Sequence, residues 1–186
     1  ALDPLRIANQ LAQKPLYGWL IFSQDGTAVS SSSGIDIGVH ASLDDLKPDT
    51  YLFVCSGNNG TKIASDTILG QVRRHARFGG KLGGVCTGAA TLARAGLLKG
   101  KKFTLHWENQ PGFAETFPDL TPTPQRFEQD GDLLTCGGGV AATEMMISII
   151  AQDYGEEFAI AVSDMCLNGP DITTRSEQRS SIAKAI

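Results

Sequence analysis

The feature that most constrains this chain is a cysteine between a short strand and a helix, in the segment KLGGVCTGAATLARAGLL. Residues 81–85 are expected to form the strand, Cys86 the turn, and residues 87–95 the helix. A turn this tight requires neighbours with little or no side chain, which the chain supplies at Gly83, Gly84 and Gly88. The pattern predicts an elbow that presents the Cys86 thiol at the edge of a sheet.

The expected position of Cys86 carries a chemical implication. A helix N-terminus has partial positive charge and free N–H groups, which favour a thiolate over a thiol. The Thr87 N–H is expected to face any molecule bound there. Cys86 and Thr87 are therefore candidate site residues.

Strands and helices alternate along the rest of the chain. Asp3 as N-cap and Pro4 at the first helical position predict a helix near the start. A hairpin is expected around Asp130-Gly131. The other expected strands are residues 17–22, 50–55 and 102–105, and the other expected helices are residues 61–78, 109–117, 140–154 and 156–165. The alternation predicts a doubly wound, three-layer α/β sandwich with a mostly parallel, flavodoxin-like sheet.

Ligands bind at the carboxyl ends of the strands in such a sheet. Cys55, Cys86 and Cys136 all stand at expected strand ends. The loop that contains Gly57 and Asn58 should lie beside the elbow, where its backbone N–H groups can form part of an oxyanion-type site. His106 follows another expected strand and can reach the same place.

Composition and charge exclude several classes of protein. The chain has 186 residues, 41% hydrophobic and 19% charged, which suits one soluble domain. Since no apolar run approaches the roughly 18–20 residues of a membrane helix, we expect a cytoplasmic protein without a membrane partner. The net charge is −4, whereas nucleic-acid binding requires a basic surface. The basic cluster at residues 73–77 is interpreted as a solvated helix face.

The cysteines do not indicate a metal site. Four cysteines are spread along the chain without CxxC spacing, and the three histidines do not complete a ligand pattern. We expect free thiols, with no metal and no cofactor. Cys55, Cys136 and Cys166 are interpreted as small buried residues, Trp107 as a packing residue that can line a pocket, and Glu144 as a local hydrogen-bond acceptor.

Together these residues resemble the class I glutamine amidotransferase-like superfamily that includes PfpI-type proteins, and in particular the sensor half of AraC-family regulators. The resemblance extends from Pro4 to about Leu167. It is carried by the segments PLRIAN, GGVCTGAATLARAGLL, FTLHW, ETFPDL and DGDLLTCGGGVAATEMM.

The resemblance implies a ligand-sensing and dimerising domain over residues 1–167 and a linker over residues 168–186. The linker would lead to a C-terminal helix-turn-helix domain, through which alone the protein would contact DNA. The implied effector is a small nitrogenous metabolite such as an amino acid or betaine. By match, Cys86 is the elbow cysteine, His106 the superfamily histidine, and Gly57 the glycine near the oxyanion site.

The chain departs from the family pattern at three places. The family begins with a buried strand ahead of the PLRIAN helix, so we expect either a missing first strand or another segment in its place. Superfamily enzymes have an acid near the first helix, for which Asp3 is the candidate here. Ser56 replaces the first glycine of the usual loop pair.

Two alternatives to the sensor remain open. In an active thiol enzyme of the superfamily, a hydrolase, hydratase or glyoxalase-type lyase, Cys86 would be the nucleophile and His106 the general base. In a redox sensor, Cys86 would be oxidised and a second thiol, Cys55 or Cys136, would resolve it.

Overall fold

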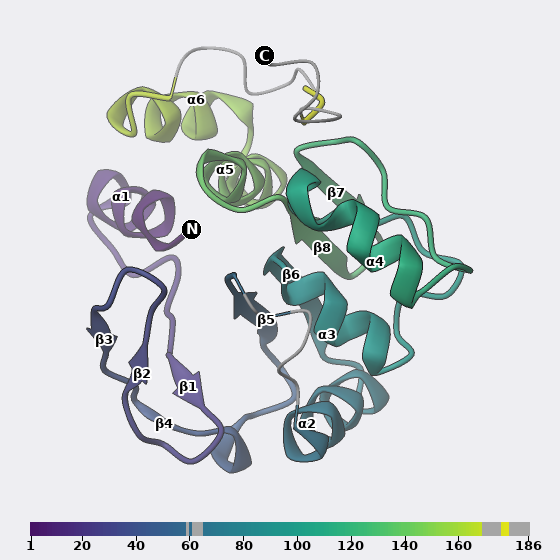
Figure 1. The fold of residues 1–186 in the computed structure, drawn as a ribbon. Helices are drawn as coiled ribbons and strands as arrows, with labels where there is room; N and C mark the ends of the chain where they lie inside the picture. The colour runs from purple at the N-terminus through teal and green to yellow at the C-terminus, as the bar shows by residue number, and fades with distance from the viewer. Residues whose placement is uncertain (59, 61–64, 169–175, 179–186) are drawn as a thin grey trace.

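A computed structural model describes residues 1–58, 60, 65–168 and 176–178 of the chain. Its centre is a four-stranded sheet with the order β5-β6-β8-β7 (Figure 1). Strands β5 (Tyr51–Ser56), β6 (Lys81–Cys86) and β8 (Leu133–Cys136) are parallel. Strand β7 (Phe127–Asp130) runs antiparallel to β8 and forms the predicted hairpin with it.

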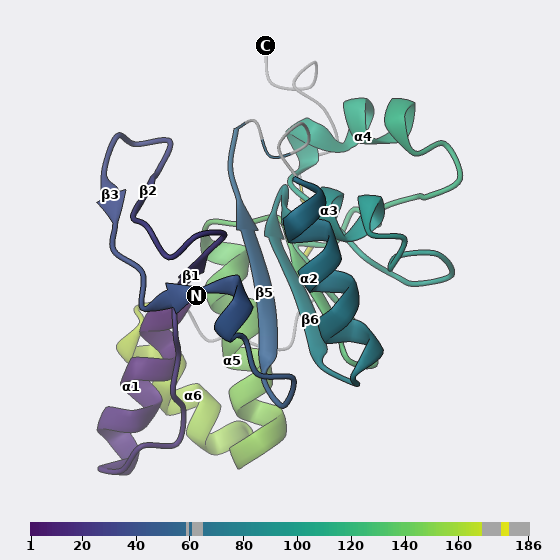
Figure 2. The same ribbon diagram turned by 90° about the horizontal axis from the view of Figure 1, so that it is seen from below.

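Helices cover both faces of this sheet, as Figures 1 and 2 show. Helices α2 (Asp66–Arg77) and α3 (Gly88–Arg94) pack on one face. Helix α5 (Val140–Tyr154) packs on the other, where α1 (Leu2–Ala12) and α6 (Glu156–Met165) lie against it. The predicted doubly wound, three-layer α/β sandwich is confirmed.

The core divides along the sheet. On one side, α3 buries almost its entire surface, and Leu92 and Leu105 pack there without exposed area. On the other side, Met145 and Met146 are buried against β8. The η2 turn (Trp107–Asn109) and helix α4 (Gln110–Thr116) lead away from the core, and Phe113 ties α4 back to it. The site loops are thus mounted on a well-packed framework.

A smaller set of strands lies beside β5. Strand β1 (Phe22–Ser23) pairs in parallel with β4 (Ala41–Ser42), and β2 (Val29–Ser30) forms a hairpin with β3 (Asp36–Ile37). The hairpin projects from the body of the molecule (Figure 2). A single helical turn, η1 (Leu43–Asp45), follows β4, with the Ser42 side chain as its cap.

The expected strand over residues 17–22 is wrong for most of its length. Only Phe22 joins a ladder, as the first residue of β1. The Asn9 side chain instead accepts hydrogen bonds from the N–H groups of Leu16 and Tyr17, at 2.8 Å each. The apolar run has strand propensity, but a strand forms only where a neighbour supplies backbone partners.

The expected strand over residues 102–105 is also absent as a regular strand. The Lys102 N–H donates to the Asp130 carboxylate at 2.8 Å, and the Thr104 N–H donates to Thr135 Oγ1 at 2.9 Å. Side chains of the β7–β8 hairpin therefore satisfy this backbone in place of a strand ladder. Periodicity alone does not reveal that substitution.

The prediction of Asp3 as a helix cap also needs correction. Helix α1 begins at Leu2, and Asp3 lies inside its first turn, where it pairs with Arg6 at 2.7 Å and does not act as a cap. Strand β5 occupies the predicted segment, and Leu52 is its only buried residue. Because β5 is at the edge of the four-stranded sheet, it is covered incompletely.

Helix α2 carries the basic cluster at residues 73–77, and the prediction of a solvated face fails only at His75. The Arg73 guanidinium donates to the Arg94 and Ala95 carbonyls, both at 3.0 Å, and so caps the end of α3. His75 is buried and bonds to the carbonyls of Thr50 and Lys81. His75 therefore departs from the predicted solvated face, whereas Arg73, Arg74 and Arg77 are exposed as expected.

Some predictions fall outside the described residues. These are the part of the expected helix at residues 61–64, loop residue 59, and linker residues 169–175 and 179–186. Among the described helices, none is long and apolar enough to cross a membrane.

The close approach of α3 to β5 predicts a large effect of Gly88→Ala. A methyl group at Gly88 would overlap the Val54 carbonyl oxygen, so the helix or the strand must move. We expect a loss of about 2–3 kcal/mol in unfolding free energy, measured by urea denaturation. Gly70→Ala in α2 is the control: with open space around Gly70, it should stabilise by about 0.5–1 kcal/mol. Equal effects of the two substitutions would contradict this packing.

Candidate functional site

The elbow has the predicted geometry. Cys86 ends β6 with a backbone φ of 59°. This left-handed conformation is rare for residues other than glycine. Helix α3 begins two residues later at Gly88. A methyl group on Gly84 would lie 2.8 Å from the Ala89 nitrogen, so glycine is needed where the helix folds back over the strand. The structure therefore presents Cys86 on a strained strand-to-helix turn.

The loop after β5 lies beside this elbow, where the sequence places Gly57 and Asn58. The Thr87 hydroxyl donates to the Gly57 carbonyl oxygen at 2.8 Å. Gly60 also packs against Thr87, because a side chain at Gly60 would overlap the Thr87 hydroxyl. Asn58 is exposed in the turn between these glycines. The loop turns a carbonyl, and not only N–H groups, toward the elbow.

Three cysteines meet at the ends of adjacent strands. The register places Val85 opposite both Cys55 and Cys136, one residue before Cys86. Burial raises the pKa of the Cys136 thiol to about 11, although the N–H groups of Gly138 and Cys86 donate to it and oppose the shift. Cys136 is thus protonated at neutral pH, which disfavours it as a resolving thiolate. Within the described ranges, no three His, Cys, Asp or Glu side chains group to hold a metal ion.

The Cys86 thiol does not have the expected thiolate character. Burial raises its pKa above the ordinary thiol range, and the Glu108 carboxylate raises it further. A hydrogen bond from the Thr87 N–H lowers the pKa, but it does not outweigh burial. The prediction from the helix N-terminus counted only the favourable dipole. Desolvation of the thiol, which depends on the tertiary structure, decides the result.

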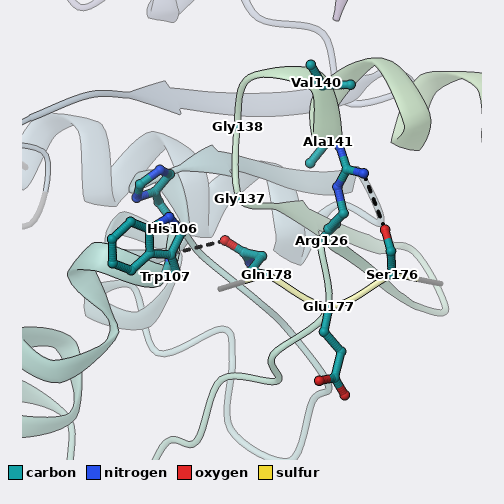
Figure 3. A pocket seen from close by; sticks show the side chains of 10 residues that line it. All are labelled: His106, Trp107, Arg126, Gly137, Gly138, Val140, Ala141, Ser176, Glu177 and Gln178. Atoms are coloured by element: carbon teal, nitrogen blue, oxygen red, sulfur yellow. Dashed lines mark hydrogen bonds between the residues drawn. The ribbon is translucent and has the colours of Figure 1, made fainter. Parts of the chain in front are cut away.

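A cavity of about 360 Å³ opens next to the elbow (Figure 3). Its walls come from four separate stretches of the chain. The residues that line the cavity are His106, Trp107, Arg126, Gly137, Gly138, Val140, Ala141, Ser176, Glu177 and Gln178. Gly138 connects the cavity to the elbow, because a methyl group there would lie 2.9 Å from the Cys86 Cβ. The cavity therefore adjoins Cys86.

Arg126 brings a positive charge to the cavity wall. Its guanidinium pairs with the Glu144 carboxylate at 2.9 Å, and Nη1 donates to the Ser176 hydroxyl at 3.3 Å. Burial raises the pKa of Glu144, and the nearby Arg126 opposes that shift. Glu144 is therefore an ion-pair partner rather than the simple local acceptor that was expected. Both contacts are made by Nη1, and they hold the guanidinium at the cavity.

His106 and Trp107 form an aromatic pair on another wall. Their ring centroids are 5.6 Å apart, and Figure 3 shows both side chains on one side of the cavity. His106 Nδ1 lies 4.0 Å from a Glu108 carboxylate oxygen, and the imidazole is about a third exposed. Trp107 thus lines a pocket, as the sequence had allowed.

Asp3, the expected acid partner, stands elsewhere. It is exposed and paired with Arg6. Burial raises the pKa of the Cys166 thiol, and the Asp3 carboxylate adds to that effect, so Asp3 lies near Cys166 at the end of α6. Of the residues predicted for the site, the structure places Cys86, Thr87, Gly57 and Asn58 at the elbow and His106 on the cavity wall.

Sequence reasoning missed Arg126 and Gln178. Arg126 precedes an edge strand without any local motif, and Gln178 lies in a segment that was interpreted as a linker. The triple-glycine turn after Cys136 was the one sequence signal for this part of the site, because consecutive glycines indicate that another part of the chain packs closely against the turn. Gly138 and Gly139 both have positive φ, which explains the choice of glycine there.

The sandwich with a cysteine elbow at the carboxyl ends of its strands defines the class: an amidotransferase-like α/β domain with an adjoining ligand-sized pocket. A family model matches residues 17–152, and the chain belongs to the DJ-1/PfpI family.

Relatives of known class are mainly regulators. The chain is 41% identical to the HTH-type transcriptional regulator GlxA of Rhizobium meliloti, over 99% of this chain and 57% of that protein. It is 37% identical to the HTH-type transcriptional regulator CdhR of Pseudomonas aeruginosa, over 98% and 54%. The chain thus spans little more than half the length of these curated relatives.

A solved structure shows the same fold. The crystal structure of an AraC family transcriptional regulator from Pseudomonas putida has a TM-score of 0.79 and 29% identity, with 89% of each chain covered. The expected relationship to AraC-type regulators is confirmed at the level of homologues.

The electrostatics of the elbow predict slow alkylation of Cys86. Because burial and Glu108 raise the thiol pKa, reaction with iodoacetamide should become rapid only above pH 8.5, roughly the pKa of a free cysteine. Glu108→Gln removes the repelling charge and should move the pH profile down by less than about one pH unit. Peptide mass spectrometry after timed alkylation measures the rate at Cys86.

Glu115→Gln, in an exposed turn of α4, is the matched control and should leave the profile unchanged. Full reactivity of Cys86 at pH 6 would contradict the raised pKa.

Proposed function

We propose that this domain senses a small nitrogenous metabolite, of the amino acid or betaine kind, for an AraC-type transcriptional regulator. The observation that carries the proposal is the cavity beside Cys86, which has a fixed guanidinium on one wall and an aromatic pair on another. Its volume of about 360 Å³ suits a small molecule. The regulator relatives support the role but do not name the ligand.

The wall chemistry supports a ligand with both a carboxylate and a cationic nitrogen. A guanidinium binds carboxylates through paired, charge-assisted hydrogen bonds, and Arg126 is held in place for this by Glu144. The faces of Trp107 and His106 offer a surface to an ammonium group, because a π-system attracts cations. The two features together match a zwitterion of amino acid size.

The elbow residues then take the role of recognition. In this proposal Cys86, Thr87, Gly57 and Asn58 form the end of the binding site next to Gly138. A protonated thiol there donates or accepts a weak hydrogen bond, which suits contact with a ligand. Asp3 has no place in this site, because its carboxylate lies beside Arg6.

The remaining parts of the proposal concern the whole regulator. We propose that it works in the cytoplasm as a homodimer and contacts DNA through a helix-turn-helix domain. The HTH-type relatives extend well beyond the length that this chain matches, which leaves room for such a domain in them.

A thiol enzyme is the second candidate. The strained Cys86 backbone favours it, and an isonitrile hydratase of Pseudomonas putida is 28% identical over 73% of this chain. The raised pKa of Cys86 argues against it, since a nucleophile needs the thiolate at working pH. Cys86→Ser separates the two: a sensor keeps ligand binding, whereas an enzyme loses turnover.

The sensor proposal predicts thermal stabilisation by zwitterions. We expect some member of a panel of amino acids, betaines and polyamines to raise the melting temperature, since a ligand at 100 times its Kd stabilises by about 2.7 kcal/mol. Carboxylate-free polyamines should have no effect. Differential scanning fluorimetry measures the shift.

Variants at the ion pair sharpen this test. The double variant Arg126→Gln/Glu144→Gln removes both charges without leaving one buried alone, and it should weaken binding of a hit by more than about tenfold. Arg6→Gln, at an exposed ion pair, should leave binding unchanged. The absence of any shift across the panel would overturn the proposal.

A further inference from the structure

Residues 176–178 bind back onto the domain although they belong to the segment expected to be a linker. Glu177 forms an antiparallel bridge with Gln125. The Arg126 N–H donates to the Ser176 carbonyl at 3.0 Å, and the Gln178 N–H donates to the Pro124 carbonyl at 2.6 Å. This short segment, which we call the strap, thus adds a strand-like edge beside the start of β7.

The Gln178 side chain fixes the strap to the loops that carry the cavity. Its amide nitrogen lies 3.0 Å from Thr104 Oγ1, 3.1 Å from the Leu105 carbonyl and 2.8 Å from the Gln125 carbonyl. Its amide oxygen accepts the Trp107 N–H at 3.0 Å, as Figure 3 shows. An amide suits this surrounding, because its nitrogen has two N–H donors that the three acceptor oxygens share and its oxygen accepts the backbone N–H of Trp107.

The strap also forms part of the cavity itself. Ser176, Glu177 and Gln178 all line it, and Ser176 contacts the guanidinium of Arg126. A methyl group on Gly137 would lie 2.5 Å from the Gln178 amide oxygen, so the cavity wall and the strap are in direct contact. Without the strap the cavity loses one wall and Trp107 loses a backbone partner.

We propose that the strap is the output element of the pocket: its docking depends on the state of the cavity walls, and it transmits that state to the chain beyond Gln178. The inference rests on the proposed function for what fills the cavity. The link between strap and wall is a property of the protein alone. A ligand that contacts both Arg126 and the strap binds only the docked form and therefore shifts the strap toward docking.

Limited proteolysis tests the docking. Trypsin cuts after arginine, and Arg175 and Arg179 flank the strap in the sequence. Cleavage after Arg175 requires residues 176–178 to enter the protease, so its rate reports the undocked fraction. Gln178→Glu replaces the donor that faces three acceptor oxygens, and we expect cleavage to accelerate about tenfold or more.

The matched control is Glu177→Gln in the same strap. Figure 3 shows the Glu177 side chain pointing away from the other labelled residues, so this variant should be cleaved at the wild-type rate. Gly137→Ala disturbs the contact between the cavity wall and the Gln178 amide, so it should accelerate cleavage as Gln178→Glu does. An unchanged melting temperature of the domain distinguishes release of the strap from global unfolding.

The fluorescence of Trp107 reports the effect of the strap on the cavity wall. In a Trp19→Phe background, Trp107 is the only tryptophan, and Gln178→Glu should shift its emission to the red. The proposal is overturned if Gln178→Glu is cleaved no faster than wild type, or if cleavage accelerates while Trp107 emission stays the same. If no metabolite of the panel binds, the proposed ligand class is wrong, but the expected cleavage rates and the expected shift of the Trp107 emission are unaffected.

Discussion

The structure depends on one close contact: helix α3 packs directly on the backbone of β5 and β6. Gly88 lies against the Val54 carbonyl, and Gly84 lies against the Ala89 nitrogen. A Cβ atom at either glycine would clash with that neighbour, so the approach is possible only with glycine. Because the helix starts so close to the sheet, the chain must turn within two residues, and Cys86 takes the left-handed conformation that this requires. The position of the thiol is thus a result of backbone packing.

The parts of the fold that could be predicted from sequence are those with local sequence signals. The elbow, the β7–β8 hairpin and helices α5 and α6 have local signals, namely glycines, a turn dipeptide and helical periodicity. Residues 17–22 and 102–105 have strand-like composition, but several of their backbone partners are side chains, namely those of Asn9, Asp130 and Thr135. Such partners depend on the tertiary structure and leave no pattern in the segment itself.

The site divides in the same way. Cys86, Thr87 and Gly57 were found from strand order, because parallel strands bring their carboxyl ends to one edge. Arg126 and Gln178 were not found, since each acts through contacts more than 15 residues away in sequence. The charge state of Cys86 was predicted wrongly for a related reason: the dipole is local to the helix, whereas burial and Glu108 depend on how the chain folds around the thiol.

The elbow and the polar groups of the cavity are under different constraints. The elbow is fixed by glycine contacts, and almost any change there disturbs the sheet. Arg126 and the strap lie at the periphery, directly before an edge strand and in a chain segment that follows the last helix, where substitution costs the core little. One rigid elbow can therefore support pockets for different ligands, and the segment that completes the pocket is also the one that continues the chain. In the two proposals made above, recognition and output share this structural element.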